Sequence, residues 1–75
     1  MNQLILNRIC EIASDIFGGN VSEASSPETV PGWDSVQHLN LMLAIEAEYG
    51  FQFLPEEMER AKSIGKIAGL VAARQ

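Results

Sequence analysis

The sequence has few of the features that mark secreted, membrane-spanning or nucleic-acid-binding proteins. Its only cysteine is Cys10, so no internal disulfide can form, and we expect a reducing, cytoplasmic setting. Five basic residues stand against ten acidic ones, a net charge of −5, which argues against nucleic acid as a partner. No run approaches the ~20 apolar residues of a membrane span. The N-terminal segment also lacks the basic leader and long apolar core of a secretory signal.

The length and composition predict one small globular domain over residues 1–75. Apolar residues make up 47% of the chain and charged residues 20%, which is typical of a folded protein. A domain of this size buries only about 60–65% of the surface that its unfolded chain exposes. A deep catalytic cavity is therefore difficult to enclose. A monomer is the default expectation, and the net negative charge favours a partner with a basic face.

The pattern of apolar residues predicts an all-α, four-helix bundle with a long loop between the first and second helices. Isoleucines recur at positions 5, 9, 12 and 16, on one face of a helix over residues 2–17. Gly18 and Gly19 end this helix. The segment NVSEASSPETVPGW that follows is rich in serine, proline and glycine, and predicts a loop. No alternating strand pattern is present.

Three further helices follow the loop. The second is expected from Asp34 to Tyr49, with Asp34 and Gln37 as a capping box. Pro55 opens a short acidic helix after an extended segment, and Ser63 caps the last helix. Gly65 and Gly69 weaken that last helix.

The second helix has two apolar arcs rather than one. The bulkier arc, on which His38 also lies, contains Leu41, Met42, Ile45 and Tyr49, and the other contains Val36, Leu39, Leu43 and Ala47. A surface helix with a single buried face needs only one arc. We expect the bulkier arc to face the core and the other to form a docking surface. The alternative is a central helix buried on both sides.

Ser35 stands at the start of this helix, and three interpretations compete. It can simply help Asp34 to satisfy the free N–H groups of the first turn. It can be a nucleophile with Asp34 and His38, which are close enough in sequence to approach it on a helix, although no oxyanion hole is apparent. It can also be an attachment point, because a phosphate esterified there meets the positive end of the helix dipole.

The segment GWDSVQHLNLMLAIEAEYGFQF resembles the signature of the acyl carrier proteins, in which an Asp-Ser-Leu-like tripeptide carries 4′-phosphopantetheine. The tripeptide is Asp34–Val36 here, with valine in place of the usual leucine. The resemblance extends through PEEME and SIGKIAGLVA and covers the whole chain. It implies that a phosphopantetheinyl transferase moves the arm from coenzyme A to Ser35. Acyl groups then travel as thioesters in fatty-acid, polyketide or related biosynthesis, and the chain itself is no enzyme.

The resemblance also implies roles for other residues. Acyl-loading and acyl-transfer enzymes with basic patches are expected to dock on Val36, Leu39 and Leu43, aided by Glu46 and Glu48. The residues implied to line an acyl pocket are Leu41, Ile45 and Tyr49, for which a plain core role is the alternative. Gln37, His38 and Asn40 depart from the family, whose housekeeping fatty-acid carriers often have acids or small polar residues there.

Three remaining side chains have simpler interpretations. Trp33 is expected to anchor the loop on the bundle, and Cys10 to lie at the edge of the core. His38 has no histidine or cysteine partner at metal-binding spacing. The rival function is a small acidic helical adaptor that binds a protein through the same exposed arc and carries no prosthetic group.

Overall fold

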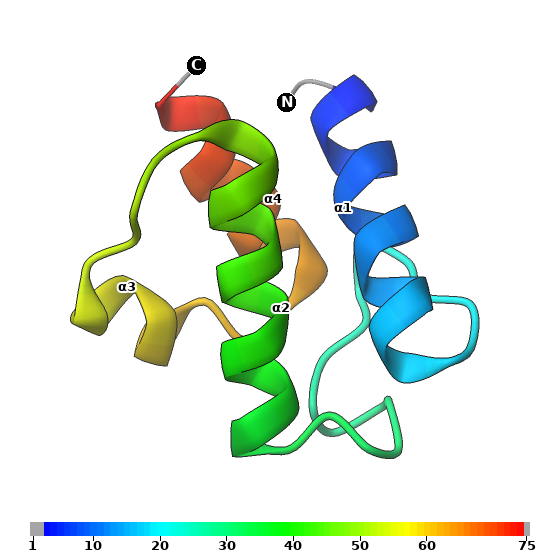
Figure 1. Cartoon of the computed structure of the whole chain (residues 1–75). Coiled ribbons are helices and arrows are strands. Elements are labelled where there is room, and N and C mark those ends of the chain that lie inside the picture. The colour runs from blue at the N-terminus through cyan, green and yellow to red at the C-terminus, as the bar shows by residue number, and fades with distance from the viewer. Residues whose placement is uncertain (1–2, 75) are drawn as a thin grey trace.

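The computed structural model describes residues 3–74, which form four helices and no strand. The helices are α1 (Gln3–Phe17), α2 (Ser35–Tyr49), α3 (Pro55–Arg60) and α4 (Ile64–Ala73). α1 runs antiparallel to α2 and α4, and the long loop crosses between the ends of α1 and α2 (Figure 1). The all-α prediction is confirmed. Asn2, where the first helix was predicted to begin, lies outside the described residues.

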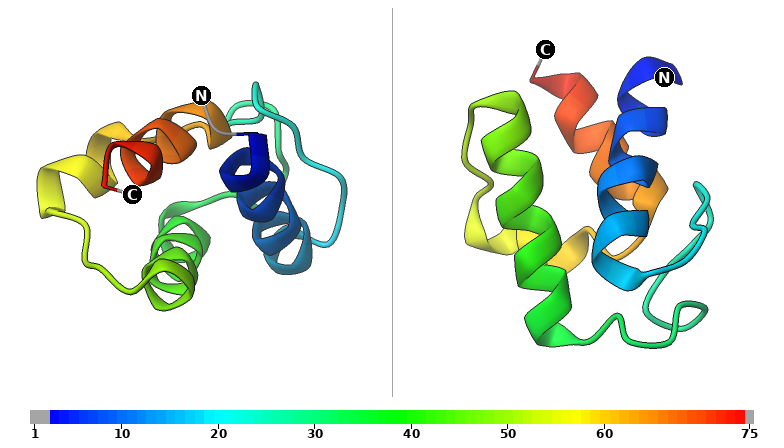
Figure 2. Two further views of the ribbon diagram at one scale, coloured as in Figure 1. Left: turned by 90° about the horizontal axis from the view of Figure 1, so that it is seen from above. Right: turned by 45° about the vertical axis from the view of Figure 1, so that its right-hand side comes forward.

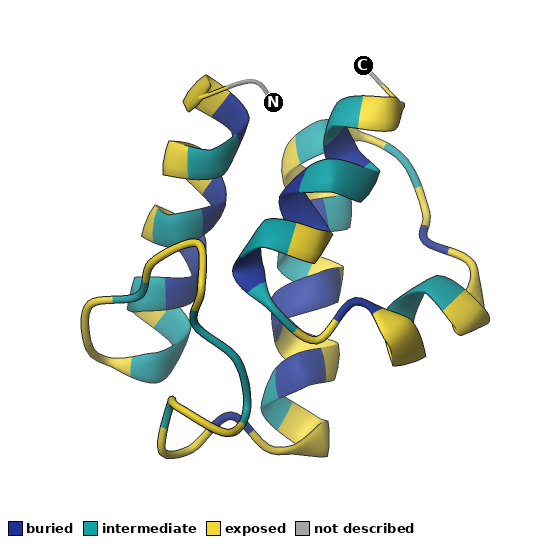
Figure 3. Ribbon diagram, turned by 180° about the vertical axis from the view of Figure 1, so that it is seen from behind, coloured by how far each residue is buried: buried dark blue, intermediate teal, exposed yellow. Residues whose placement is uncertain are grey.

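The core lies where α1 packs against α2 and α4. Among the described residues, the largest fully buried side chains are Ile9, Leu41, Met42, Ile45, Ile64, Ile67 and Val71. The buried parts of the ribbon lie on the sides of the long helices that face one another (Figure 3). By contrast, α3 has no buried residue and lies across the side of α2 (Figure 2). Hydrophobic burial thus fixes three helices, whereas from α3 only the half-buried Met58 packs against the core.

The ends of the helices follow the predicted caps, with one correction. The Asp34 carboxylate accepts a hydrogen bond from the Gln37 N–H at 2.9 Å, and Ser63 does the same for Lys66 at 3.1 Å. The Gln37 side chain, however, accepts a hydrogen bond from Asn40 at 2.8 Å. The predicted capping box is therefore only half formed, because Gln37 has a partner along the helix that competes with the cap.

The long loop is fastened to the start of α4. The Ile64 N–H donates to the Ser25 carbonyl at 3.1 Å, and the Gly65 N–H donates to the Glu23 carbonyl at 2.9 Å. A Cβ atom at position 65 would lie 3.0 Å from Glu23 Cγ and 3.2 Å from its carbonyl oxygen. Gly65 therefore allows the loop to approach α4 closely. The loop carbonyls in turn satisfy N–H groups that a helix start leaves without partners.

Candidate functional site: an exposed serine at the start of α2

Ser35 is the first residue of α2 and is exposed. Within residues 3–74, its hydroxyl takes part in no hydrogen bond, since Asp34 alone caps the helix. The backbone N–H groups of Ser35 and Val36 also have no acceptor among the described residues. Free N–H groups and the positive end of the helix dipole stabilise a negatively charged group at this point. The hydroxyl can thus be reached by another protein, and an attached phosphate would be stabilised.

His38 is committed to contacts inside the protein. Its Nδ1 accepts a hydrogen bond from Trp33 Nε1 at 3.0 Å. Its Nε2 lies 2.7 Å from the carbonyl oxygen of Met58, and because a carbonyl only accepts, Nε2 carries the proton. A neutral imidazole with both nitrogens in use cannot take a proton from Ser35. The arrangement therefore gives no geometric support to a Ser35–His38–Asp34 triad.

Trp33 anchors the loop on the bundle, as the sequence predicted. Only 4% of its surface is exposed. Its ring stacks on Phe17, with centroids 5.0 Å apart, and its centroid lies 5.9 Å from that of the His38 ring. The residue two positions before Ser35 is thereby fixed against both α1 and α2.

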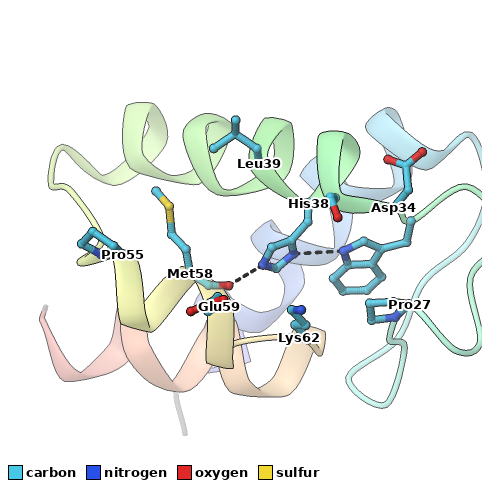
Figure 4. Close-up of a pocket in the computed structure, with 10 residues that line it drawn as sticks. Pro27, Asp34, His38, Leu39, Pro55, Met58, Glu59 and Lys62 are labelled. Carbon is cyan, nitrogen blue, oxygen red and sulfur yellow. Dashed lines mark hydrogen bonds between the residues drawn. The ribbon is translucent and has the colours of Figure 1, made fainter.

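A cavity of about 380 Å³ opens beside Ser35, between α2, α3 and the loop. Its walls include Trp33, Ser35, His38, Met58 and Lys62. Figure 4 shows His38 between the two helices, with its bond to Met58 crossing the gap. The sequence did not locate this cavity, because its walls come from segments far apart in the chain.

The residues implied as an acyl pocket do not line this cavity. Leu41 and Ile45 are fully buried, and Tyr49 is half-buried against the core. Their packing fits the plain core role that the sequence left open. Contact with an acyl chain requires that the core opens, and it stays a prediction.

The second arc of α2 is exposed, as expected. The exposed fractions are 68% for Val36, 48% for Leu39 and 49% for Leu43. Leu54, which is 52% exposed, is a further exposed apolar residue that the sequence analysis did not single out. We call Val36, Leu39 and Leu43 the α2 strip.

The two acids proposed for docking both have partners within the protein. Glu46 accepts a hydrogen bond from the Phe53 N–H at 2.6 Å and so holds the segment after α2. Glu48 pairs with Arg8 at 3.0 Å, and this hydrogen bond lowers the pKa of the Glu48 carboxyl. Both side chains remain partly exposed, so their role in docking stays a prediction.

Other kinds of site find little support in the described part of the chain. Residues 3–74 contain no cluster of three or more histidine, cysteine, aspartate or glutamate side chains able to hold a metal ion. Cys10 is half-buried, and burial raises the pKa of its thiol, which makes the reactive thiolate less available. None of the described helices has the length and apolar character needed to cross a membrane.

Comparison with solved structures identifies the class of protein. No family model and no curated protein sequence matches the chain. The solution structure of a holo acyl carrier protein from Geobacter metallireducens matches with a TM-score of 0.81 and 26% sequence identity. The match covers 92% of this chain and 83% of that one. The fold is thus that of a small helical carrier protein. The resemblance to the acyl carrier protein family is confirmed.

Proposed function

We propose that residues 1–75 act as a single acyl carrier domain that bears 4′-phosphopantetheine on Ser35. The observation that carries this proposal is the exposed hydroxyl at the first position of α2. The overall match to a holo acyl carrier protein supports a carrier role. We expect the protein to act in the cytoplasm as a partner of enzymes, with fatty-acyl, polyketide or related cargo.

The residues around Ser35 fit the attachment of this group. When bound, the arm would supply a thiol that holds acyl groups as thioesters. Asp34 fixes the first turn by bonding the Gln37 N–H, which leaves the N–H groups of Ser35 and Val36 available to the phosphate. Trp33 holds the preceding loop in place. The chain thus contributes position and electrostatic stabilisation, while the transferase and the partner enzymes perform the chemistry.

The α2 strip and its neighbouring acids form the proposed docking surface. Three apolar side chains at least 48% exposed on one helix offer an apolar contact next to the arm. The partially exposed Glu46 and Glu48 add negative charge for a basic patch on an acyl-loading or acyl-transfer enzyme. The arm and the surface would work together, because tethering raises the local concentration of cargo at a docked enzyme.

The attachment is tested by incubating the protein with coenzyme A, magnesium and a broad-specificity phosphopantetheinyl transferase. We expect the intact mass to rise by one phosphopantetheine, and the mass of Ser35→Ala to stay unchanged. Ser22, which lies in the exposed loop, offers a matched control, since Ser22→Ala should still be modified. A wild-type protein that folds but stays unmodified would favour the adaptor function instead.

Two substitutions test whether the negative charge of Glu46 contributes to docking. Glu46→Gln keeps an oxygen that can accept from the Phe53 N–H, whereas Glu46→Lys removes the acceptor and reverses the charge. If the charge contributes to docking, both variants slow acyl loading by a cognate enzyme, and Lys slows it more. Wild-type loading by Glu46→Gln would limit Glu46 to its role in holding the segment after α2.

A further inference from the structure

The Trp33–His38–Met58 arrangement has a consequence for the loop in front of Ser35. The loop donates the Trp33 Nε1–H to His38 Nδ1, and His38 donates its own proton to the Met58 carbonyl of α3. One imidazole therefore joins the loop, α2 and α3 beside the cavity. His38 is only 9% exposed and Trp33 only 4%, so water has little access to replace either bond.

The two bonds respond differently to a proton. Histidine is the side chain that changes charge between about pH 5 and 8. A protonated ring carries N–H groups on both nitrogens. Its Nε2 can still donate to Met58, but its Nδ1–H would face the Trp33 N–H, donor against donor. The buried indole N–H then loses its acceptor, which favours a conformation in which Trp33 has left the ring.

We propose that His38 is a proton-operated latch: when neutral it holds the loop in front of Ser35 closed, and when protonated it releases that loop. Release begins at Trp33 and opens the loop side of the 380 Å³ cavity. α3 stays in place, since its bond to His38 survives protonation. The latch is a property of the folded chain and does not depend on whether Ser35 carries a group.

Other charged groups near the ring have to be separated from the latch. Those lining the cavity are Asp34 at the start of α2, Glu59 on α3 and Lys62 after α3. From α1, the group packed on Trp33 is the uncharged ring of Phe17, and the loop contributes the uncharged Pro27. A His38→Gln variant leaves all these charges in place. Its amide can donate to the Met58 carbonyl but takes up no proton in this range.

The experiment follows amide hydrogen exchange from pH 7.5 to pH 5, expressed as protection factors so that the intrinsic pH dependence cancels. In the loop, the Thr29, Val30 and Trp33 N–H groups report on release. In α3, the Met58 and Ala61 N–H groups serve as internal control. We expect loop protection to fall about tenfold at low pH, the ratio that corresponds to one lost buried hydrogen bond, and α3 protection to stay constant.

Two variants and two spectroscopic measurements complete the test. The chain has a single tryptophan and a single histidine, so its fluorescence reports on Trp33 alone. The emission should shift to longer wavelength at the pH at which loop protection falls. In His38→Gln, both the emission shift and the loss of loop protection should vanish. In Trp33→Phe, which keeps a ring but lacks the donor, loop protection should not change between pH 7.5 and pH 5. Ring nitrogen NMR at pH 8 should show Nε2 protonated.

Several results would overturn the latch. A proton on Nδ1 at pH 8 would contradict the bond from Trp33. Equal loss of protection in the loop and α3 would indicate general unfolding. A loop transition that persists in His38→Gln would show that a group other than His38 causes it. If His38→Gln does not fold, Trp33→Phe decides alone, and a loop transition that persists in it refutes the proposal.

Discussion

Two leucines two residues apart on α2 provide a matched test of the division between core and docking surface. Leu41 is fully buried, whereas Leu39 is 48% exposed. Truncating a fully buried leucine to alanine costs about 2–5 kcal/mol, and a domain of this length has roughly 4–11 kcal/mol in total. At about 3 kcal/mol, Leu41→Ala should lower the Tm by roughly 12–24 °C. Leu39→Ala should cost less than about 1 kcal/mol, because only half of its side chain leaves water on folding.

In a docking assay the order of the two variants should be reversed, with Leu39→Ala showing the larger loss. Thermal unfolding followed by circular dichroism gives the stability, and the rate at which a transferase modifies Ser35 gives docking. Leu39→Ala should keep its helical content and be modified more slowly, with the loss in kcat/KM. Equal destabilisation by both substitutions would show that the α2 strip is part of the core. A wild-type modification rate for Leu39→Ala would remove Leu39 from the docking surface.

Two further predictions concern α3 and α4. Arg74 donates a hydrogen bond, 2.7 Å long, to the Glu57 carboxylate, and this bond lowers the pKa of the Glu57 carboxyl. The pair therefore stabilises the fold fully above the ordinary pKa of Glu57. The stabilisation is lost as the pH falls through the lowered pKa. Urea midpoints of wild type and Arg74→Met should therefore differ more at pH 7 than at pH 3, and a pH-independent difference would contradict this. Gly69→Ala, with no atom within 4 Å of the new Cβ, should stabilise α4 by up to about 1 kcal/mol. Gly65→Ala should raise the free energy of unfolding by less, or lower it, because the new Cβ would contact Glu23. An equal increase for both variants would show that the loop moves away from the new Cβ at no cost.

The features that were predictable from the sequence depend on short-range periodicity and capping. The step of three and four residues located α1 and the buried arc of α2, since side chains at these spacings share a helix face. Asp34 and Ser63 marked helix starts because their side chains bond N–H groups within the same turn. The position and exposure of Ser35 follow from the same local rules.

The features that escaped prediction join segments that are distant in the chain. Sequence periodicity carries no information on the bond from His38 to Met58, twenty residues on, or on the approach of Glu23 to Gly65. The capping box failed in part because Gln37 bonds to Asn40 instead. The cavity beside Ser35 is formed by the same long-range contacts, so neither its position nor its walls could be derived from local patterns.

Peptide mass spectrometry of the protein purified from its own cells shows directly whether Ser35 carries the arm. We expect the peptide containing Ser35 to carry 4′-phosphopantetheine, and fragmentation to release the arm together with any acyl group bound to it. A Ser35 peptide that is unmodified throughout growth, or an arm attached to another residue, would refute the proposed attachment to Ser35.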